Sequence, residues 1–368
     1  MKLVKTSYDS NDVTILLKDL TGVMVPLSAE EREKRIQSGS HYSSMLPLEK
    51  PPSKEYLDLY FRAVEHHEHE IAQMTAKLSA MLSAKSPRPV IVSLARAGIP
   101  VGVLLKRYLA EFLDCECPHY AISIIRDKGI DINAMEYIYD HEIATGHSTA
   151  ADIFFVDGWT GKGAIKTQLN DAVKSLIRAD KKWLGLRDDL YVLADPANIT
   201  SFCGTHKDFL LPTACLNSIV SGLISRSILN EHIRVSDGDF HGAVYFADFE
   251  PQDLSRSFVD EVSACFTPVS DEQSGFEELT ESGMSVVKRI CGRFEIKDYL
   301  KVKPGIGETT RVLLRRVPWA VLIDERADRN DFDLRHIFTL CKEKGVRVIP
   351  YNLGSYKACG IIKELADA

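Results

Sequence analysis

The chain reads IFFVDGWTGKGA at residues 153–164, and this stretch decides the fold class. Its apolar start is typical of a buried strand, which we expect to stop on the carboxylate of Asp157. A glycine-rich turn follows, and residues 164–176 are expected to form a helix. Backbone N–H groups at such a turn favour a phosphate, and a neighbouring carboxylate can hold a sugar hydroxyl or a metal ion. Because the Walker spacing is absent, the stretch alone predicts either a phosphorylated-ribose site or an ordinary strand–turn–helix connection.

Strands and helices alternate on both sides of this stretch. Strands are predicted at residues 89–94, 120–125 and 190–194, and helices at residues 53–84, 102–113 and 134–141. This alternation predicts an α/β fold with a parallel sheet and right-handed crossovers. Ligands of such sheets bind beyond the carboxyl ends of the strands. The residues that directly follow each predicted strand are therefore the candidates for a functional site.

The helix predicted at residues 53–84 carries three histidines, His66, His67 and His69. Neighbouring side chains on a helix point in different directions, which disfavours a zinc site. We expect a solvated polar face instead. The residues before Pro51 are mostly polar, with one helical piece at residues 29–38, and are interpreted as an N-terminal extension of the main domain.

Composition limits the remaining function classes. The chain has 368 residues, 45% of them hydrophobic, and a net charge of −7. Its eight cysteines include no Cys-x-x-Cys pair, which argues against zinc ribbons and dithiol redox sites. The N-terminus lacks an apolar signal core, and no apolar run approaches membrane-spanning length. The sequence predicts a cytoplasmic protein with no membrane partner.

The charge balance changes near residue 268. Residues 268–283 are acidic and rich in Ser and are interpreted as a linker. Residues 284–368 carry 17 Lys or Arg and 11 Asp or Glu, a balance of +6 against −13 for the rest of the chain. We therefore predict a domain at residues 1–267, the linker, and a basic domain at residues 284–368. Contact with polyanions and chance asymmetry are the two explanations of its charge.

The order of the predicted loops resembles that of the type I phosphoribosyltransferases. Residues 93–98 (SLARAG) stand where that family has a pyrophosphate-binding loop, and Arg126 and Lys128 stand in place of its flexible basic loop. Residues 156–163 (VDGWTGKG) stand in place of its phosphoribosyl pyrophosphate loop. The resemblance implies a type I phosphoribosyltransferase-like sheet domain that binds phosphoribosyl pyrophosphate or a ribose phosphate together with Mg²⁺.

The same resemblance assigns roles to individual residues. It implies that Arg96 and Lys128 neutralise pyrophosphate and that Asp157 holds the ribose and, indirectly, Mg²⁺. The other ligand-binding residues that it implies are Ser93, Ala97, Gly98, Thr160, Gly161, Lys162 and Gly163. Val156 replaces the second acid of the pair with which the family holds the ribose hydroxyls. A single carboxylate is therefore more compatible with binding of the ribose phosphate than with catalytic turnover. We expect transfer or cleavage at C1′ of a nucleotide or nucleoside, or, alternatively, a non-enzymatic nucleotide sensor that signals through RNA.

A closer resemblance covers nearly the whole chain. Residues 38–47, 93–100, 155–163, 211–218 and 240–243 are similar to the StiP family, phosphoribosyltransferase-like proteins linked to tellurium-resistance and stress gene clusters. The family's label includes the words cysteine protease.

A cysteine peptidase needs a thiolate beside a histidine. Cys215 with His241 is the first pair that the sequence offers, and Cys203 with His206 is the second. Cys215 lies in an apolar run at residues 214–223 that is predicted to be helical, where a buried structural cysteine is the usual finding. The peptidase is therefore kept as a further alternative.

The last portion has a resemblance of its own. Residues 303–316 (KPGIGETTRVLLRR) resemble the RNA-contacting turn and helix of Pelota and kink-turn binders. A strand at 319–324, a helix at 334–344 and a strand at 346–351 complete the expected α/β/α domain. The resemblance implies that structured RNA is a partner and is bound by Gly305, Glu308, Arg311, Arg315 and Arg316. The alternative is that this small domain binds proteins rather than RNA. The sequence is also compatible with a homodimer.

Overall fold

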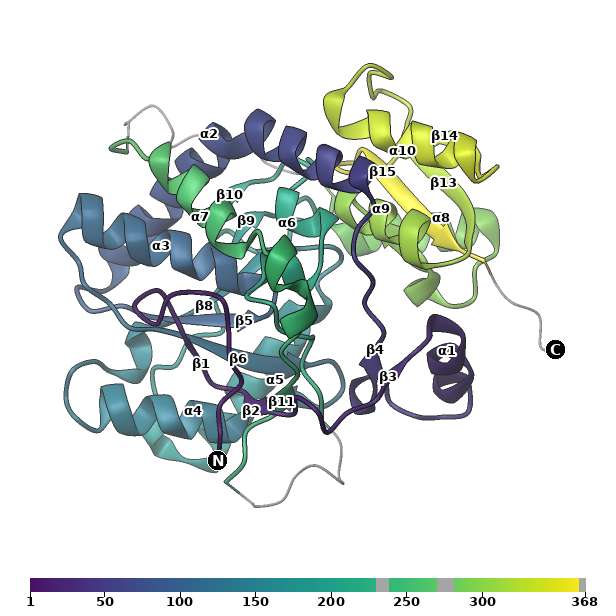
Figure 1. Ribbon diagram of the computed structural model, residues 1–368. Coiled ribbons are helices and arrows are strands. Elements are labelled where there is room, and N and C mark those ends of the chain that lie inside the picture. Colours follow the sequence, from purple (N-terminus) through teal and green to yellow (C-terminus); the bar gives the residue numbers. More distant parts are fainter. Residues whose placement is uncertain (230–237, 270–280, 364–368) are drawn as a thin grey trace.

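The computed structural model describes residues 1–229, 238–269 and 281–363, without the side chains of residues 29, 33, 37 and 315. A parallel sheet forms the centre of the larger part of the molecule (Figure 1). Its strands, in spatial order, are β1 (Thr14–Ile15), β6 (His119–Ile125), β5 (Val90–Ala95), β8 (Ile153–Trp159), β9 (Leu190–Ala194) and β10 (Cys203–Thr205). The short strand β7 (Gly129–Ile130) adds to β6 in the antiparallel sense. The predicted α/β class and parallel sheet are confirmed.

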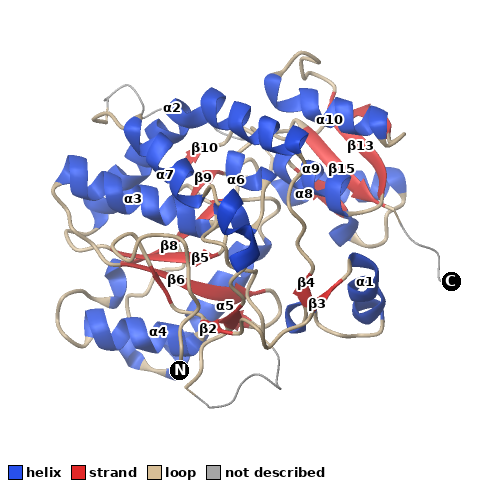
Figure 2. Ribbon diagram, in the orientation of Figure 1, coloured by secondary structure: helices blue, strands red, loops and turns tan. Residues whose placement is uncertain are grey.

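Helices cover both faces of the sheet (Figure 2). Successive strand residues such as Phe154 and Phe155 belong to two different apolar clusters, because side chains alternate across a strand. The first cluster packs against α2 (Lys54–Lys85), α3 (Gly98–Leu113) and α7 (Ser255–Ala264), and the second against α4 (Ile132–Ile138) and α5 (Ala164–Ala179). Since both faces are buried, the central strands are continuously apolar, and for this reason they could be predicted from the sequence.

The strand order reverses between β5 and β8. From β5 the chain passes to β6 on one side of it, and it later continues through β8, β9 and β10 on the other side. The loops that leave β5 and β8 therefore run in opposite directions and open a crevice at their carboxyl ends. This topological switch point is where an open α/β sheet binds its ligands.

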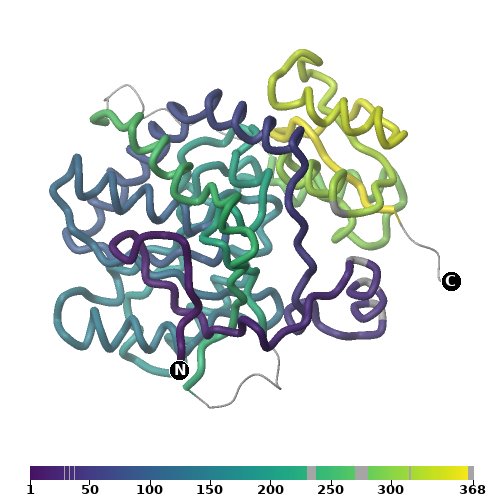
Figure 3. The backbone as a smooth tube through the Cα atoms, in the orientation of Figure 1, coloured from purple at the N-terminus to yellow at the C-terminus, as the bar shows by residue number. Residues whose placement is uncertain are grey.

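The N-terminal segment is built into the sheet domain. Strand β1 pairs with β6, and β2 (Lys18–Asp19) pairs with β11 (Gly242–Ala243). The segment continues through β3 (Pro26–Leu27), α1 (Ala29–Gln37) and β4 (Leu46–Pro47). Figure 3 shows this purple segment passing along the domain before it enters α2. The predicted extension is thus an integral part of the sheet domain.

The C-terminal part forms a second, mixed sheet. Its strands follow the order β12 (Val302–Pro304), β15 (Ala358–Ile362), β13 (Pro318–Asp324) and β14 (Arg347–Tyr351). Its helices are α8 (Gly283–Phe294), α9 (Ile306–Arg315) and α10 (Phe332–Glu343). Residues 270–280 of the predicted linker lie outside the described ranges, and Gly283, its last residue, already begins α8.

The two parts share one hydrophobic core. Ile306 and Leu313 of α9 belong to the same apolar cluster as Leu210 and Ala214 of the larger part. The backbone N–H of Gly283 also donates to the carbonyl of Ala197 at 2.7 Å. The C-terminal part is therefore docked on the sheet domain, whereas the charge pattern had suggested a tethered unit.

Two local predictions differ from the structure. The strand does not stop on Asp157, because β8 continues to Trp159 and pairs with β9 beyond that carboxylate. The apolar run at residues 214–223 is not one helix: α6 (Pro212–Cys215) ends after one turn, and a short 3-10 turn, Ser218–Val220, follows. Positive φ angles at Gly222 and Leu223 end the run, since α-helical backbone requires negative φ. None of the described helices has the length and apolarity needed to cross a membrane.

Candidate functional site

Asp157 lies at the carboxyl end of the central strands, within β8. Its side chain is buried, and Oδ1 accepts the N–H of Gly158 at 2.8 Å. Burial raises the pKa of Asp157 to about 7, although the Gly158 N–H and the charge of Arg311 partly oppose this rise. A carboxyl group with this pKa can accept or donate a hydrogen bond near neutral pH.

The glycine-rich turn after β8 leads into α5 as predicted. Gly163 occupies the N-cap position with φ of 89°, and no side chain caps the first helical N–H groups. The Thr160 hydroxyl, predicted to hold phosphate, donates instead to the carboxylate of Asp195. Asp195 also accepts the N–H groups of Ile199 and Thr200. Thr160 therefore holds the turn against the β9 loop.

The loop after β5 contains residues with mainly structural contacts. Arg96 donates to the carbonyl of Ile224 at 2.8 Å and forms an ion pair with the buried Glu49 at 3.0 Å. Ser93 is fully buried between His119 and the carbonyl of Gly98. A Cβ on Gly98 would lie 2.3 Å from the carbonyl oxygen of Val156, so glycine is needed there for close packing of α3 on β8.

A cavity of about 470 Å³ opens over these carboxyl ends, between the two parts of the molecule. Among the predicted residues, Asp157, Arg96, Ala97, Thr160, Gly161, Lys162 and Gly163 line it. Lys128 instead lines a second cavity of about 160 Å³ with Asp131 and His241. Of the predicted basic loop, Arg126 is the residue that reaches the larger cavity.

The C-terminal part forms the other wall of this cavity. Glu308 and Arg311 of α9 line it, together with Lys303 of β12 and Tyr299. The sequence did not predict that these four residues line the cavity, because no local pattern indicates a contact between segments about 150 residues apart in the chain. The predicted RNA-contacting segment thus faces the glycine-rich turn.

Specific contacts hold the two walls together. Lys162 Nζ donates to the carbonyls of Tyr299 at 2.8 Å and Val302 at 3.0 Å, and the Tyr356 hydroxyl donates to the carbonyl of Gly161 at 2.7 Å. The guanidinium of Arg311 lies 4.6 Å from the centre of the Trp159 ring, within range of a cation–π interaction. The turn and α9 are therefore fixed relative to each other.

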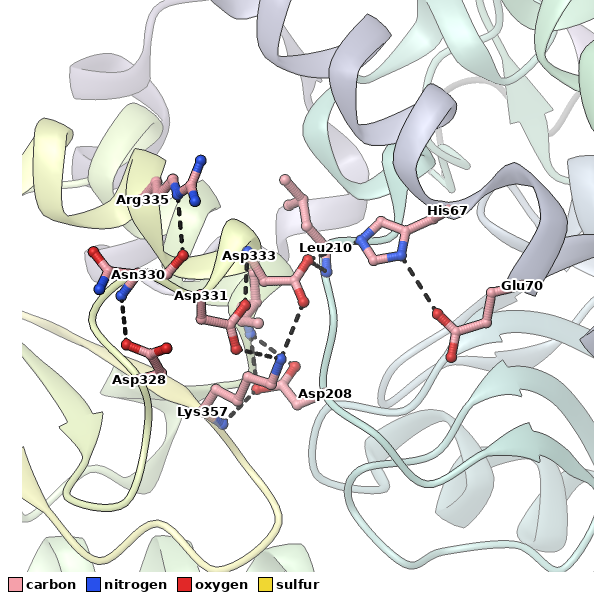
Figure 4. Close-up of polar contacts among 11 residues, drawn as sticks. His67, Glu70, Asp208, Leu210, Asp328, Asn330, Asp331, Asp333, Arg335 and Lys357 are labelled. Carbon is pink, nitrogen blue, oxygen red and sulfur yellow. Dashed lines mark hydrogen bonds and ion pairs between the residues drawn. The ribbon is translucent and has the colours of Figure 1, made fainter.

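A buried charged network holds α10 against the sheet domain (Figure 4). Asp333 accepts from His67 Nε2 at 2.9 Å, from the N–H of Leu210 at 2.9 Å and from Lys357 Nζ at 3.1 Å. Asp208 accepts the N–H groups of Ile306 and Lys357. The predicted solvated face of α2 is wrong at His67, which is buried. Ala63 and Ile71, one helical turn before and after His67, are buried too. The apolar residues at this spacing were the sequence feature that could have placed His67 on the buried face of α2.

The two charges of this network reinforce each other. Burial, the largest single effect, would lower the pKa of His67, but the hydrogen bonds and charges of Asp333 and Glu70 together outweigh burial and raise that pKa to about 9. Burial would raise the pKa of Asp333, but His67, the N–H of Leu210 and the charge of Lys357 together lower it to about 2. Both side chains are therefore charged at neutral pH.

The charges around the large cavity favour an anionic ligand. Six basic residues line the cavity, namely Arg96, Arg126, Lys162, Lys166, Lys303 and Arg311. Three acidic residues accompany them, namely Asp127, Asp157 and Glu308. A cavity of this size accommodates a nucleotide-sized molecule, and the excess of cations favours phosphate groups.

The predicted RNA-binding residues fall into two groups. Gly305 is buried at the domain contact, where a Cβ would lie 3.5 Å from Asp208 Oδ1, and Glu308 and Arg311 line the cavity. Arg316 is exposed, and the side chain of Arg315 lies outside the described ones. Among the members of the group whose side chains are described, Arg316 is the exposed one.

The two predicted cysteine–histidine pairs lie in different surroundings. Cys215 is buried in the core on α6, whereas His241 lines the second cavity and bonds to Ser123 at 2.8 Å. Cys203 Sγ lies 3.5 Å from His206 Nε2, and His206 Nδ1 lies 3.7 Å from a carboxylate oxygen of Asp195. Burial raises the pKa of the Cys203 thiol to about 12, which keeps this thiol protonated and weakly nucleophilic.

Comparison with known proteins agrees with the motifs. Residues 6–263 match the family described as tellurite-like stress resistance cysteine protease StiP, and residues 281–364 match the Pelota RNA-binding domain. A protein from Acinetobacter baylyi named cysteine protease StiP is 33% identical over 374 residues, which cover 98% of this chain and 94% of the relative. No solved structure matches the chain. The family resemblance is therefore confirmed: the chain belongs to the StiP family and carries a Pelota-type domain at its C-terminal end.

Proposed function

We propose that this StiP-family chain binds phosphoribosyl pyrophosphate, or a related ribose phosphate, in the cavity between its two parts and reacts at C1′ of the ribose. The observation that carries the proposal is the composite cavity at the switch point of a parallel sheet, lined by a glycine-rich turn, six basic residues and the buried Asp157. A type I phosphoribosyltransferase-like fold is part of this proposal and is supported by the strand order around β5 and β8.

In the proposed arrangement, the N–H groups of the turn from Gly161 to Gly163 and the start of α5 hold the 5′-phosphate. Asp157 accepts a ribose hydroxyl. Arg126 and Lys303 neutralise the diphosphate, a role for which the sequence had suggested Arg96 and Lys128. Because Arg96 forms an ion pair with Glu49, Glu49 partly neutralises its charge, and Arg96 attracts a diphosphate less strongly.

The reaction consists of one displacement at C1′. The C1′–O bond to diphosphate breaks, the electron pair leaves with diphosphate, and a nitrogen of the acceptor bonds to C1′ while its proton passes to water. Positioning and charge stabilisation by the cavity cations lower the barrier. Carboxylate oxygens such as those of Asp157 and Glu308 are the ligand type that Mg²⁺ prefers, and the ion would add positive charge beside the diphosphate.

The test is thermal unfolding with phosphoribosyl pyrophosphate and Mg²⁺. A ligand present at about one hundred times its Kd should stabilise the wild type by roughly 2.7 kcal/mol. Gly161→Val should abolish this gain, because a side chain at Gly161 projects toward Glu308, whose Cγ lies 3.8 Å from the added Cβ. Gly292→Val, at an exposed helical position with open space, is the matched control and should keep the gain.

An unstabilised wild type would contradict the proposed ligand. Stabilisation without release of diphosphate, in the presence of candidate bases, would instead favour the non-enzymatic sensor.

RNA binding is the second function, supported by the match of residues 281–364 to the Pelota RNA-binding domain. We expect a folded stem–loop RNA to bind the full chain with an affinity that falls as salt rises, because phosphate contacts release condensed cations. Arg316→Glu should weaken binding and lower the salt slope by about one. Arg88→Glu, an exposed arginine of the sheet domain, is the matched control. Equal binding by the two variants, or no salt dependence, would contradict this surface.

The family name makes a cysteine peptidase the other enzyme reading, with Cys203, His206 and Asp195 as the group in contact. The burial of Cys203 and the raised pKa of its thiol support a structural role. The ligand cavity is therefore the better supported site.

A further inference from the structure

Glu308 lies directly over the glycine-rich turn, although it comes from the C-terminal domain. It is in the first turn of α9, and its Cγ lies 3.8 Å from the position that a Cβ on Gly161 would take. Its Oε1 pairs with Arg311 Nη1 at 3.0 Å, and its side chain remains 26% exposed, on the cavity side. No described side chain other than that of Arg311 is hydrogen-bonded to this carboxylate.

The position of Glu308 is set by contacts on both sides of it. Asp208 of the sheet domain accepts the N–H of Ile306 at 3.0 Å and so holds the start of α9. The hydroxyl of Tyr356 and the amine of Lys162 tie the turn to the C-terminal domain at 2.7 Å and 2.8 Å. The carboxylate of Glu308 is thus held in place before any ligand enters.

The carboxylate of Glu308, placed among the basic residues of the cavity, favours a ligand that has hydrogen-bond donors as well as phosphate groups. Phosphate groups account for the six basic residues of the cavity but would be repelled by an ionised acid. Burial would raise the pKa of Glu308, but Arg311 and Lys303 outweigh burial and lower it, so the acid is ionised at neutral pH. Vicinal sugar hydroxyls are donors that two carboxylates, Asp157 and Glu308, can share.

We infer that Glu308 accepts a hydroxyl of the ribose in the cavity, so that the C-terminal domain completes the ligand site of the sheet domain. This inference rests on the proposed function.

Titration of the full chain with two probes, phosphoribosyl pyrophosphate and inorganic pyrophosphate, tests the inference. Glu308→Gln should weaken binding of phosphoribosyl pyrophosphate at least about tenfold, within the range for a lost hydrogen bond to a charged group. Binding of inorganic pyrophosphate should be unchanged or tighter, because it has no hydroxyl and one repelling charge is gone. Glu308→Asp should restore part of the loss, and Glu325→Gln, at an exposed position, is the matched control.

The outcomes separate the inference from the proposed function. If the wild type binds neither probe, the proposed function fails. If the wild type binds phosphoribosyl pyrophosphate and Glu308→Gln binds it equally well, the inference is overturned. Equal weakening of both probes would also overturn it, because Glu308 would then act on the phosphates through Arg311. The melting temperature of each variant without ligand shows whether the fold is kept.

Discussion

Replacing Asp333 by alanine is expected to lower the free energy of unfolding by about 3 kcal/mol, because the change breaks a buried ion pair and leaves His67 with the more distant Glu70, at 3.5 Å, as its acidic partner. Asp333 bonds to His67 and to Lys357, and it also accepts the N–H of Leu210. The side chains of Asp333 and His67 are 6% and 5% exposed, so water cannot replace the lost contacts. Urea unfolding of the full chain measures the effect.

Asp328→Ala is the matched control for this prediction. Asp328 lies five residues earlier, is exposed, and accepts the N–H of Asn330 within its own loop. Its removal should change stability by less than about 1 kcal/mol. Equal effects of the two changes would mean that the buried network does not hold the C-terminal domain on the sheet domain.

Stability is expected to fall as pH rises from about 6.5 to 9, with His67 as the main cause. Its pKa of about 9 in the folded chain lies above the unfolded value of 6.5, so its contribution is complete below 6.5 and is lost as pH passes 9. A difference of this size corresponds to at most about 3 kcal/mol. Asp333 has a lowered pKa, and its contribution is present throughout this pH window.

Asp208 acts in the same direction at lower pH. Burial raises its pKa to about 7, so stability from its protonated form is lost as pH rises from about 4 to 7. Urea unfolding at pH 4, pH 7 and pH 9.5 separates the two residues, because Asp208 acts mainly below pH 7 and His67 mainly above it. His67→Gln should remove most of the change above pH 7, whereas His66→Gln, the exposed neighbour that stacks on Phe332, should keep it. A flat wild-type profile above pH 7 would contradict the buried ion pair.

The elements that carry the predicted site are present, whereas several of its side chains have structural partners that the sequence did not indicate. The turn from Gly161 to Gly163 and the following α5 were predicted from a local pattern and are present. Thr160, Arg96 and Ser93 were predicted to touch the ligand, but each bonds mainly to other parts of the protein. The sequence of a loop predicts its backbone geometry. The partners of its side chains, such as Glu49 for Arg96 and Asp195 for Thr160, lie far away in the sequence and are not predicted by it.

The parallel α/β sheet, the glycine-rich turn after β8 and the family could be predicted from the sequence, because buried strands and glycine turns have local patterns that do not depend on distant residues. Tertiary structure alone decided that His67 is buried, that Lys128 lines another cavity and that Glu308 faces Gly161. The burial of His67 and the position of Glu308 depend on the docking of the C-terminal domain, which brings together charges far apart in the chain. Only the packed interface removes water from those charges, and so only the folded chain sets their pairing.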